Sequence, residues 1–336
     1  MANLRKMFGG EFLPHECRAN PAIQGLMMKT TTLATALVLA ATAVPALGAD
    51  LLYKKAAPPP APAPSMFDIA LGTAIATDYN FRGISQSDRG PSVSGYFEPR
   101  FKIAPNFEIY AGIGGLSVKL PTDPTAEIDL YAGIRPTFGP VNFDFGVLYY
   151  YYPNETQLFC VAACPSAGTT GVTPFPWTKA NTDFWEVYGK AAYTFADVVT
   201  LGANVYHSPN WLNTGATGTY GSLTGKVTVP TSWMPPDIGA YVSAELGRYW
   251  LGTTDAFFGN TPLPDYTYWN VGLGLTYKAL TLDLRYHDTD LNRAQCFVLT
   301  GDPGGLPAGP GQSLSRWCSE AFIAKLSVDT TLAALK

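Results

Sequence analysis

Apolar and polar residues alternate one by one along most of the chain after residue 65. In the segment FDIALGTAIAT, every second residue from Phe67 to Ile75 is apolar or β-branched, and the residues between them are mostly small or polar. A period of two is typical of a β-strand with one apolar face. The pattern recurs in about twelve segments, which we place at 66–78, 91–102, 106–118, 126–137, 140–152, 183–195, 198–208, 220–229, 237–250, 266–278, 280–291 and 319–328.

Short and long connections alternate between these segments. The short ones include Gly139-Pro140 and Ala196-Asp197, whereas the long ones include 153–182 and 292–318. Bacterial outer-membrane barrels have short turns at one end and long loops at the other. Strands of about ten residues also match a tilted crossing of the hydrocarbon layer. The sequence therefore predicts an all-β fold: a transmembrane antiparallel up-and-down β-barrel of about 12 strands over residues 66–328.

Composition favours this barrel over a soluble β-sandwich or lipocalin-like barrel. Charged residues make up only 14% of the chain and aromatic residues 13%. The outer faces of a soluble antiparallel sheet would carry many charges. Aromatic residues at the segment ends are typical of girdles at the two membrane interfaces, and we assign to them Tyr149 to Tyr152, Trp185, Trp250, Trp269 and Tyr286.

The N-terminal part reads as an export signal. Lys29 is followed by an apolar stretch over 33–44 and by Ala46-Leu-Gly48, which is the order of a signal peptide with a small-residue cleavage site. A buried core helix is the alternative. We therefore predict an upstream extension with a cleaved signal peptide over 1–48, a Pro/Ala-rich periplasmic tether over 49–65, the barrel, and a C-terminal tail over 329–336. The predicted location is the outer membrane of a Gram-negative cell.

Export to an oxidising compartment predicts disulfides. The mature part keeps four cysteines, which allow three connectivities; we favour Cys160–Cys164 and Cys296–Cys318, because each pair closes within one predicted loop. No histidine or second CxxC accompanies Cys160 and Cys164, so a metal site is disfavoured. The net charge of −4 argues against a nucleic-acid partner. We expect no cofactor.

If the apolar faces meet lipid, the opposite faces line the lumen. Charges of both signs then face it, and they can pair across neighbouring strands: Glu98, Arg100, Lys102, Glu108, Glu127, Asp129, Arg135, Asp144, Glu186, Lys190, Glu245, Asp283 and Arg285. Two interpretations stay open, a narrow selective pore and a salt-bridged plug. We favour the pore, because a barrel of this size is of intermediate width and many lumenal residues are Gly, Ala or Ser.

The stretch ATDYNFRGISQSDRGP over 76–91 is the most distinctive in the chain. We expect Asp78 to end the lumenal face of the first strand, Tyr79 and Phe81 to reach the outer interface, and Gly83 to permit a tight turn. Arg82 is expected to fold back onto Asp78 or Asp88. The favoured interpretation is a structural extracellular loop, and the alternative is a loop that leans over the pore mouth.

Several motifs resemble the TorF-type porin family of proteobacteria. They are TDYNFRGISQ (77–86), IYAG (109–112), EIDLYAG (127–133), YYYYP (149–153), FWEVYG (184–189) and LDLRYHDTD (282–290). The resemblance implies an outer-membrane barrel that acts as a pore. The chain departs from the family pattern at its end, because residues 329–336 (DTTLAALK) carry no terminal aromatic residue.

The predicted function is a porin for passive diffusion of small hydrophilic solutes or ions. The expected partners are outer-membrane lipid, those solutes and the outer-membrane assembly machinery; the sequence specifies no oligomeric state. One alternative is a plugged structural or surface-receptor barrel. An outer-membrane lipid hydrolase is disfavoured, because His207 and Ser208 are neighbours on a strand and so point to opposite faces, and because His287 fits a polar rim. We therefore predict no enzyme activity.

Overall fold

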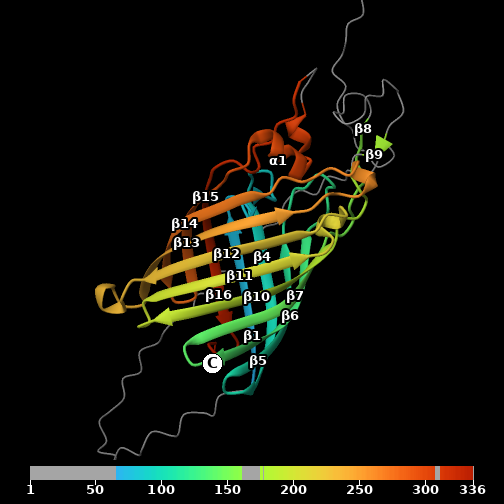
Figure 1. The fold of residues 1–336 in the computed structure, drawn as a ribbon. Helices are drawn as coiled ribbons and strands as arrows, with labels where there is room; N and C mark the ends of the chain where they lie inside the picture. The colour runs from blue at the N-terminus through green and yellow to red at the C-terminus, as the bar shows by residue number, and fades with distance from the viewer. Residues whose placement is uncertain (1–65, 161–174, 177, 307–310, 336) are drawn as a thin grey trace, which may run out of the picture. The chain divides into compact units, whose positions relative to one another are not determined.

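The computed structural model describes residues 66–160, 175–176, 178–306 and 311–335. Twelve long strands follow one another along the described chain (Figure 1). They are β1 (Phe67–Ala76), β4 (Ser92–Ala104), β5 (Phe107–Leu116), β6 (Glu127–Phe138), β7 (Val141–Tyr151), β10 (Phe184–Phe195), β11 (Val199–Ser208), β12 (Gly218–Thr228), β13 (Ile238–Leu251), β14 (Tyr266–Tyr277), β15 (Leu280–Thr289) and β16 (Ala321–Thr331).

These strands form a closed barrel. Each pairs antiparallel with the next one along the chain, and β1 pairs with β16 to close the sheet, with Leu71 opposite Thr330. The predicted up-and-down barrel of about 12 strands is therefore confirmed. The last strand runs to Thr331, past the expected barrel end at residue 328. The predicted signal peptide and tether lie outside the described residues.

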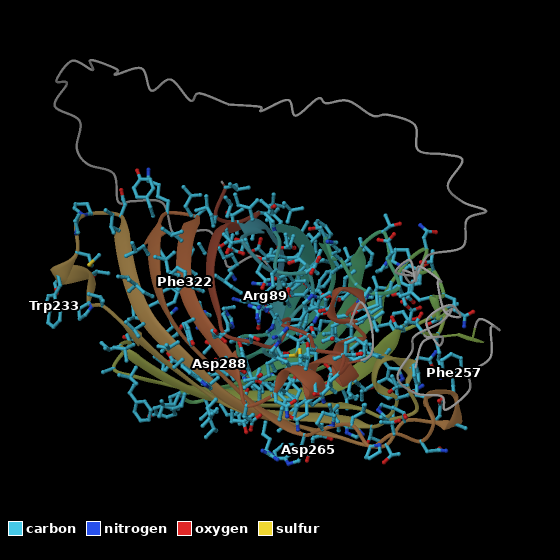
Figure 2. The ribbon with its side chains drawn as sticks, turned by 90° about the horizontal axis from the view of Figure 1, so that it is seen from above. Arg89, Trp233, Phe257, Asp265, Asp288 and Phe322 are labelled. Atoms are coloured by element: carbon cyan, nitrogen blue, oxygen red, sulfur yellow. A yellow bond between two sulfur atoms is a disulfide. The ribbon has the colours of Figure 1, made fainter. Side chains whose placement is uncertain are left out.

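Long loops and short turns lie at opposite ends of the barrel. The helix α1 (Arg293–Thr300) belongs to the same end as the short strands β8 (Phe159–Cys160) and β9 (Phe175–Pro176) (Figure 1). Figure 2 places Phe257, in a long loop, and Trp233, in a short turn, at opposite ends. The described connections also contain the hairpin of β2 (Asn80–Phe81) and β3 (Ile84–Ser85) and the 3-10 turns Trp211–Asn213, Thr231–Trp233, Ala256–Phe258 and Pro303–Gly305.

Large apolar side chains cover the outside of the barrel wall. Ile75 is 56% exposed, Leu223 65% and Phe322 67%, although water would disfavour so continuous an apolar surface. Five aromatic residues assigned to the interface girdles also point outward: Tyr149, Tyr151, Trp185, Trp250 and Trp269. No helix in the described part of the chain is long and apolar enough to cross a membrane. The outer surface is that of a barrel whose strands face lipid.

Tyrosines fill much of the lumen, contrary to the expectation that small residues leave it open. Tyr131 lies opposite Gly112, and Tyr110 lies opposite Gly133, on neighbouring strands. A Cβ added to either glycine would collide with the ring of its partner. The same arrangement pairs Tyr96 with Gly72, Tyr188 with Gly146 and Tyr241 with Gly274. The lumenal glycines thus make room for rings rather than for solute.

Candidate functional site

The loop after β1 enters the barrel and occupies its lumen. Its hairpin over residues 79–85 touches the wall from β6 round to β15. Tyr79 donates to Glu127 of β6 (2.6 Å), Phe81 packs edge-on against Tyr150 of β7, and Gly83 lies against Thr289 of β15. The expectation that Tyr79 and Phe81 face the outer interface is therefore wrong. Both rings turn inward, where a tyrosine hydroxyl can reach a buried carboxylate.

Arg82 is at the tip of this hairpin and pairs with Glu186 of β10. Its two terminal nitrogens donate to the two carboxylate oxygens at 2.7 and 2.8 Å, and the Glu186 side chain is fully buried. The guanidinium carbon also lies 4.6 to 5.0 Å from the centres of four rings, those of Phe81, Tyr206, Tyr220 and Tyr249. The predicted pairing of Arg82 with Asp78 or Asp88 is wrong, because the hairpin carries Arg82 away from both.

Local turn chemistry sets this hairpin. Asp78 accepts hydrogen bonds from the hydroxyls of Ser85 (2.6 Å) and Ser87 (2.9 Å), which joins the two ends of the hairpin. The side chain of Asn80 accepts from the backbone N–H of Gly83 (2.9 Å). Gly83 has φ +91°, and a Cβ there would collide with Thr289 and Tyr268. Glycine therefore supplies both the left-handed backbone and the close approach that the tip requires.

The loop before β16 holds the base of the hairpin. The backbone N–H of Ser85 donates to the carbonyl of Trp317 (2.9 Å), and Arg89 donates to the carbonyls of Arg316 and Ser319. This loop contains α1. The disulfide Cys296–Cys318 joins α1 to the end of the loop beside Trp317, as expected from the sequence. For the predicted pair Cys160–Cys164, Cys164 lies outside the described residues. The two loops therefore interlock at the long-loop end.

Two lumenal carboxylates beside the hairpin have no ion-pair partner in the described part of the chain. Glu127 is 2% exposed and accepts from the hydroxyls of Tyr79 (2.6 Å) and Tyr152 (2.9 Å). One oxygen of Asp129, two residues further along β6, is buried and has no hydrogen-bond partner. Tyr152 and Tyr150 thus point into the lumen, although the sequence placed the whole run 149–152 in an outer girdle.

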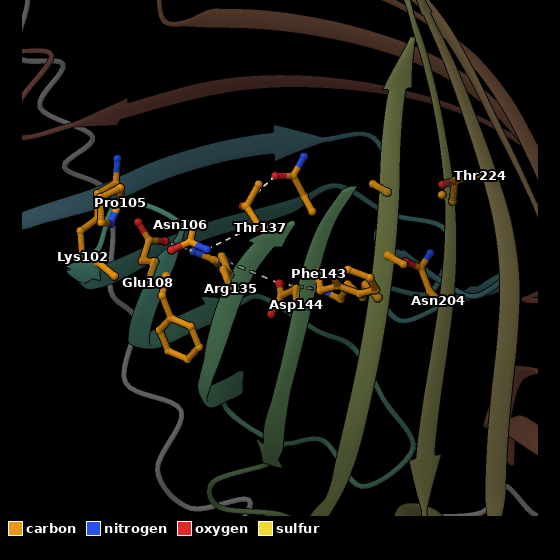
Figure 3. A pocket seen from close by; sticks show the side chains of 17 residues that line it. Lys102, Pro105, Asn106, Glu108, Arg135, Thr137, Phe143, Asp144, Asn204 and Thr224 are labelled. Carbon is orange, nitrogen blue, oxygen red and sulfur yellow. Dashed lines mark hydrogen bonds and ion pairs between the residues drawn. The ribbon is translucent and has the colours of Figure 1, made fainter. Parts of the chain in front are cut away.

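Towards the short turns, the lumen contains a cavity of about 500 Å³ lined by charges of both signs. Arg135 lies between three carboxylates: its nitrogens are 2.8 Å from Glu98, 3.1 Å from Glu108 and 3.5 Å from Asp144. Lys190 is 3.8 Å from Asp144 on the same wall. Figure 3 shows Arg135 between Glu108 and Asp144 at the cavity wall.

A deeper cavity of about 240 Å³ shares Arg135, Asp144 and Lys190 with the first and reaches Asp129. Arg100, a further predicted lumenal residue, donates to Glu98 (2.6 Å). The network on these strands can hold small charged groups, because Arg135, Lys190 and the carboxylates beside them can each exchange a partner for a solute group of opposite sign. Lys102 also lines the first cavity, and no ion pair holds it in the described part of the chain. The predicted lumenal set on β4 to β10 thus separates into this network, the Glu186 that pairs with Arg82, and the unpaired Lys102, Glu127 and Asp129.

The remaining predicted charges lie on the opposite side of the barrel. Arg285 donates to both oxygens of Asp283 at 2.9 Å and to Ser243 at 2.8 Å. Glu245 accepts from the hydroxyl of Tyr220 (2.8 Å) and from Asn270 (3.2 Å). These groups are separate from the cavity network, and the sequence alone could not assign their partners.

Neither histidine of the described chain is arranged with a nucleophile. His207 bonds to the hydroxyl of Thr219 (2.9 Å) on the outer side of the wall, whereas Ser208 is fully buried. His287 faces the lumen and bonds to the hydroxyl of Tyr268 (2.8 Å). The described residues also contain no group of three or more His, Cys, Asp or Glu that can hold a metal ion.

The sequence interpretation missed the inward tyrosines, which supply most of the hydroxyl partners in the lumen. The signal that could have found them is their position in the alternation of polar and apolar residues along each strand. Tyr150 lies an even number of residues from Asp144 on β7, and Tyr188 an even number from Glu186 on β10, so each ring shares the face of that carboxylate. A tyrosine in phase with polar residues should be assigned to the polar face, because its hydroxyl needs a partner that lipid does not offer.

Comparison with known proteins gives a partial family match and distant structural neighbours. Residues 60–164 match the family described as "bacterial protein of unknown function (Gcw_chp)". No curated protein matches the chain. Among solved structures, it is similar to an outer membrane channel from Pseudomonas putida F1 (11% identity, 80% of this chain and 97% of that chain, TM-score 0.41).

Two further neighbours are outer-membrane expressed OmpT of Vibrio cholerae (11% identity, 79% of this chain and 97% of that chain, TM-score 0.35) and LpxR from Salmonella typhimurium (9% identity, 77% of this chain and 99% of that chain, TM-score 0.36). At these low identities and TM-scores, the fold rests on the strand pairing of this chain, and its function must be inferred from its own residues.

Proposed function

We propose that this barrel is an outer-membrane channel for small hydrophilic solutes or ions. The observation that carries the proposal is the charged cavity of about 500 Å³ inside a barrel with an apolar outer surface. A polar lumen bounded by paired charges offers a path through a lipid layer that is closed to such solutes. The resemblance of the 77–86 and 149–153 motifs to TorF-type porins agrees with this assignment.

The hairpin over 79–85 occupies the lumen above this cavity, so a solute that crosses must displace the hairpin or pass beside it. This feature favours a second candidate, a plugged barrel that acts as a surface receptor through its long loops. The channel is preferred because the short-turn half of the lumen stays hollow, whereas a purely structural barrel has no need of a cavity there. A lipid hydrolase is not proposed, since His207 and Ser208 lie on opposite sides of the wall.

Current measurements on the refolded chain in a planar lipid bilayer test the channel. We expect reproducible single-channel steps. Arg135→Ala should shift the permeability ratio toward cations, because Glu98, Glu108 and Asp144 lose the positive charge that they share. Arg248→Ala is the matched control, since Arg248 is an exposed cation near the long-loop end, 3.9 Å from Asp265, and its loss should leave selectivity unchanged.

Silence of the folded wild type and of a variant with a loosened hairpin would contradict the channel and favour the receptor. Equal selectivity shifts in Arg135→Ala and Arg248→Ala would contradict the placement of the conducting path beside Arg135.

A further inference from the structure

The surroundings of Arg82 have the features of a binding site for a guanidinium ion. A carboxylate meets the two terminal nitrogens in a fork, at 2.7 and 2.8 Å. Aromatic rings surround the flat guanidinium group, with centres 4.6 to 5.0 Å from its carbon. Paired N–H donors and delocalised charge make a guanidinium the cation that such a carboxylate and ring set recognises best.

The barrel wall supplies nearly all of this site. Glu186 belongs to β10, and Tyr206, Tyr220 and Tyr249 belong to β11, β12 and β13; of the four rings, only Phe81 belongs to the hairpin. The hydroxyl of Tyr150 on β7 donates to Glu186 at 3.0 Å and fixes its orientation. If the hairpin withdrew, the wall residues of the site would therefore remain in place. The buried carboxylate of Glu186 would then lack a compensating cation.

We propose that this guanidinium site, formed by Glu186, Tyr206, Tyr220 and Tyr249, binds solutes that carry a guanidinium group, and that Arg82 occupies it as an internal ligand. The inference rests on the proposed channel and names a solute class for it. An external guanidinium compound that takes the place of Arg82 removes the charged anchor of the hairpin tip. Replacement of Arg82 by the solute at Glu186 would thus both bind the solute and open the lumen.

Methylguanidinium and methylammonium are suitable probes, because they differ mainly in the shape of the cation. In Arg82→Ala the site is vacant, and calorimetry should show methylguanidinium binding at least ten times more tightly than methylammonium. The double variant Arg82→Ala/Glu186→Gln should lose this preference. Arg82→Gln, which also removes the cation, is a second variant in case Arg82→Ala does not fold, and heat-modifiable migration on a gel checks folding of each.

Equal binding of the two probes to folded Arg82→Ala, or an unchanged preference after Glu186→Gln, would overturn the guanidinium site. In the wild type, millimolar methylguanidinium on the long-loop side should raise the frequency of open events several-fold, and methylammonium should not. If every variant is silent but the calorimetric preference holds, the channel fails and the site stands. If the variants conduct but show no preference, the site fails and the channel stands.

Discussion

The Arg82 guanidinium is held where an unpaired charge is least tolerated. It is 8% exposed and its partner Glu186 is fully buried. Removing one member of a buried ion pair leaves the other charge without compensation, which typically destabilises a protein by about 3–5 kcal/mol. The hairpin position therefore depends strongly on this single pair, and the surrounding rings add a smaller cation–π contribution.

Glu186→Gln should release the hairpin tip. If the free energy that holds the hairpin in the lumen falls by about 3 kcal/mol, the population of molecules with a released hairpin rises about a hundred-fold. Trypsin should then cleave after Arg82 much faster than in the wild type, as measured by mass spectrometry of timed digests. Glu108→Gln is the control, because Glu108 pairs with Arg135 (3.1 Å) in the cavity network and contacts no part of the Arg82 site. Equal cleavage rates in all three proteins would show that the pair does not anchor the hairpin.

Lys179 and Asp255 form a pair in the long loops, outside the strands, at 2.7 Å. The hydrogen bond from Lys179, with its charge, lowers the pKa of Asp255 from its ordinary value of 3.8. A lowered folded-state pKa means that the pair stabilises the loops above that ordinary value, and that this contribution is lost as the pH falls through the lower pKa. The contribution is below about 1 kcal/mol, because the pair is partly exposed.

The Asp255 pKa measured by NMR in detergent should return towards 3.8 in Lys179→Met. Lys119→Met is the control, since Lys119 pairs with Asp88 in another loop. An Asp255 pKa that does not change between the wild type and Lys179→Met would contradict the pairing.

At the level of elements, the loop between β15 and β16 acts as a clamp on the hairpin. Its helix α1 begins with a capping box, in which Asn292 and Gln295 satisfy each other's backbone N–H groups, and ends at Gly301 in the left-handed conformation. The backbone hydrogen bond from Ser85 to Trp317 attaches the hairpin to this ordered loop. The disulfide joins α1 to the segment that makes that contact.

Replacing both cysteines, Cys296→Ser with Cys318→Ser, should loosen the clamp. The pair closes a loop with a sequence separation of 22, for which constraint of the unfolded chain is worth about 3 kcal/mol. We expect faster hydrogen exchange over 293–300 and over 84–89, and little change in the strands. Wild-type protein treated with reductant should behave in the same way. Unchanged exchange in the hairpin would show that the two loops are independent.

At the level of the whole molecule, the barrel is defined by an apolar exterior and a polar interior. Alternation along the strands predicted both, together with the order of short and long loops, because the period of two and the turn lengths are local properties of the sequence. The partner of Arg82 was not predictable in this way. Glu186 is 104 residues away, and only closure of the barrel brings the two together. Tyr150 was misplaced because an aromatic ring near a strand end fits an outer girdle, although its phase along β7 matches the polar face.

The exterior gives a direct test of the membrane setting. Leu223 lies in the middle of β12 and is 65% exposed on the outer wall. Leu223→Arg should destabilise the barrel folded in lipid vesicles by about 2–4 kcal/mol, the usual loss for a cation near the bilayer midplane. Denaturant titration in vesicles measures the loss, with Leu223→Ala as the control for the missing side chain. Equal stabilities of the two variants would contradict a lipid-facing position for Leu223.

The joining of β1 to β16 has a consequence for the order of biogenesis. The hairpin follows the first strand, yet β10 to β13, which surround its tip, are synthesised later, and β16, which closes the wall, comes last. The disulfide-bonded loop then lies against the hairpin base through Trp317. We therefore expect the hairpin to enter the lumen before β1 pairs with β16. Oxidation of Cys296 and Cys318 should follow this entry, so that premature oxidation would delay maturation of the barrel.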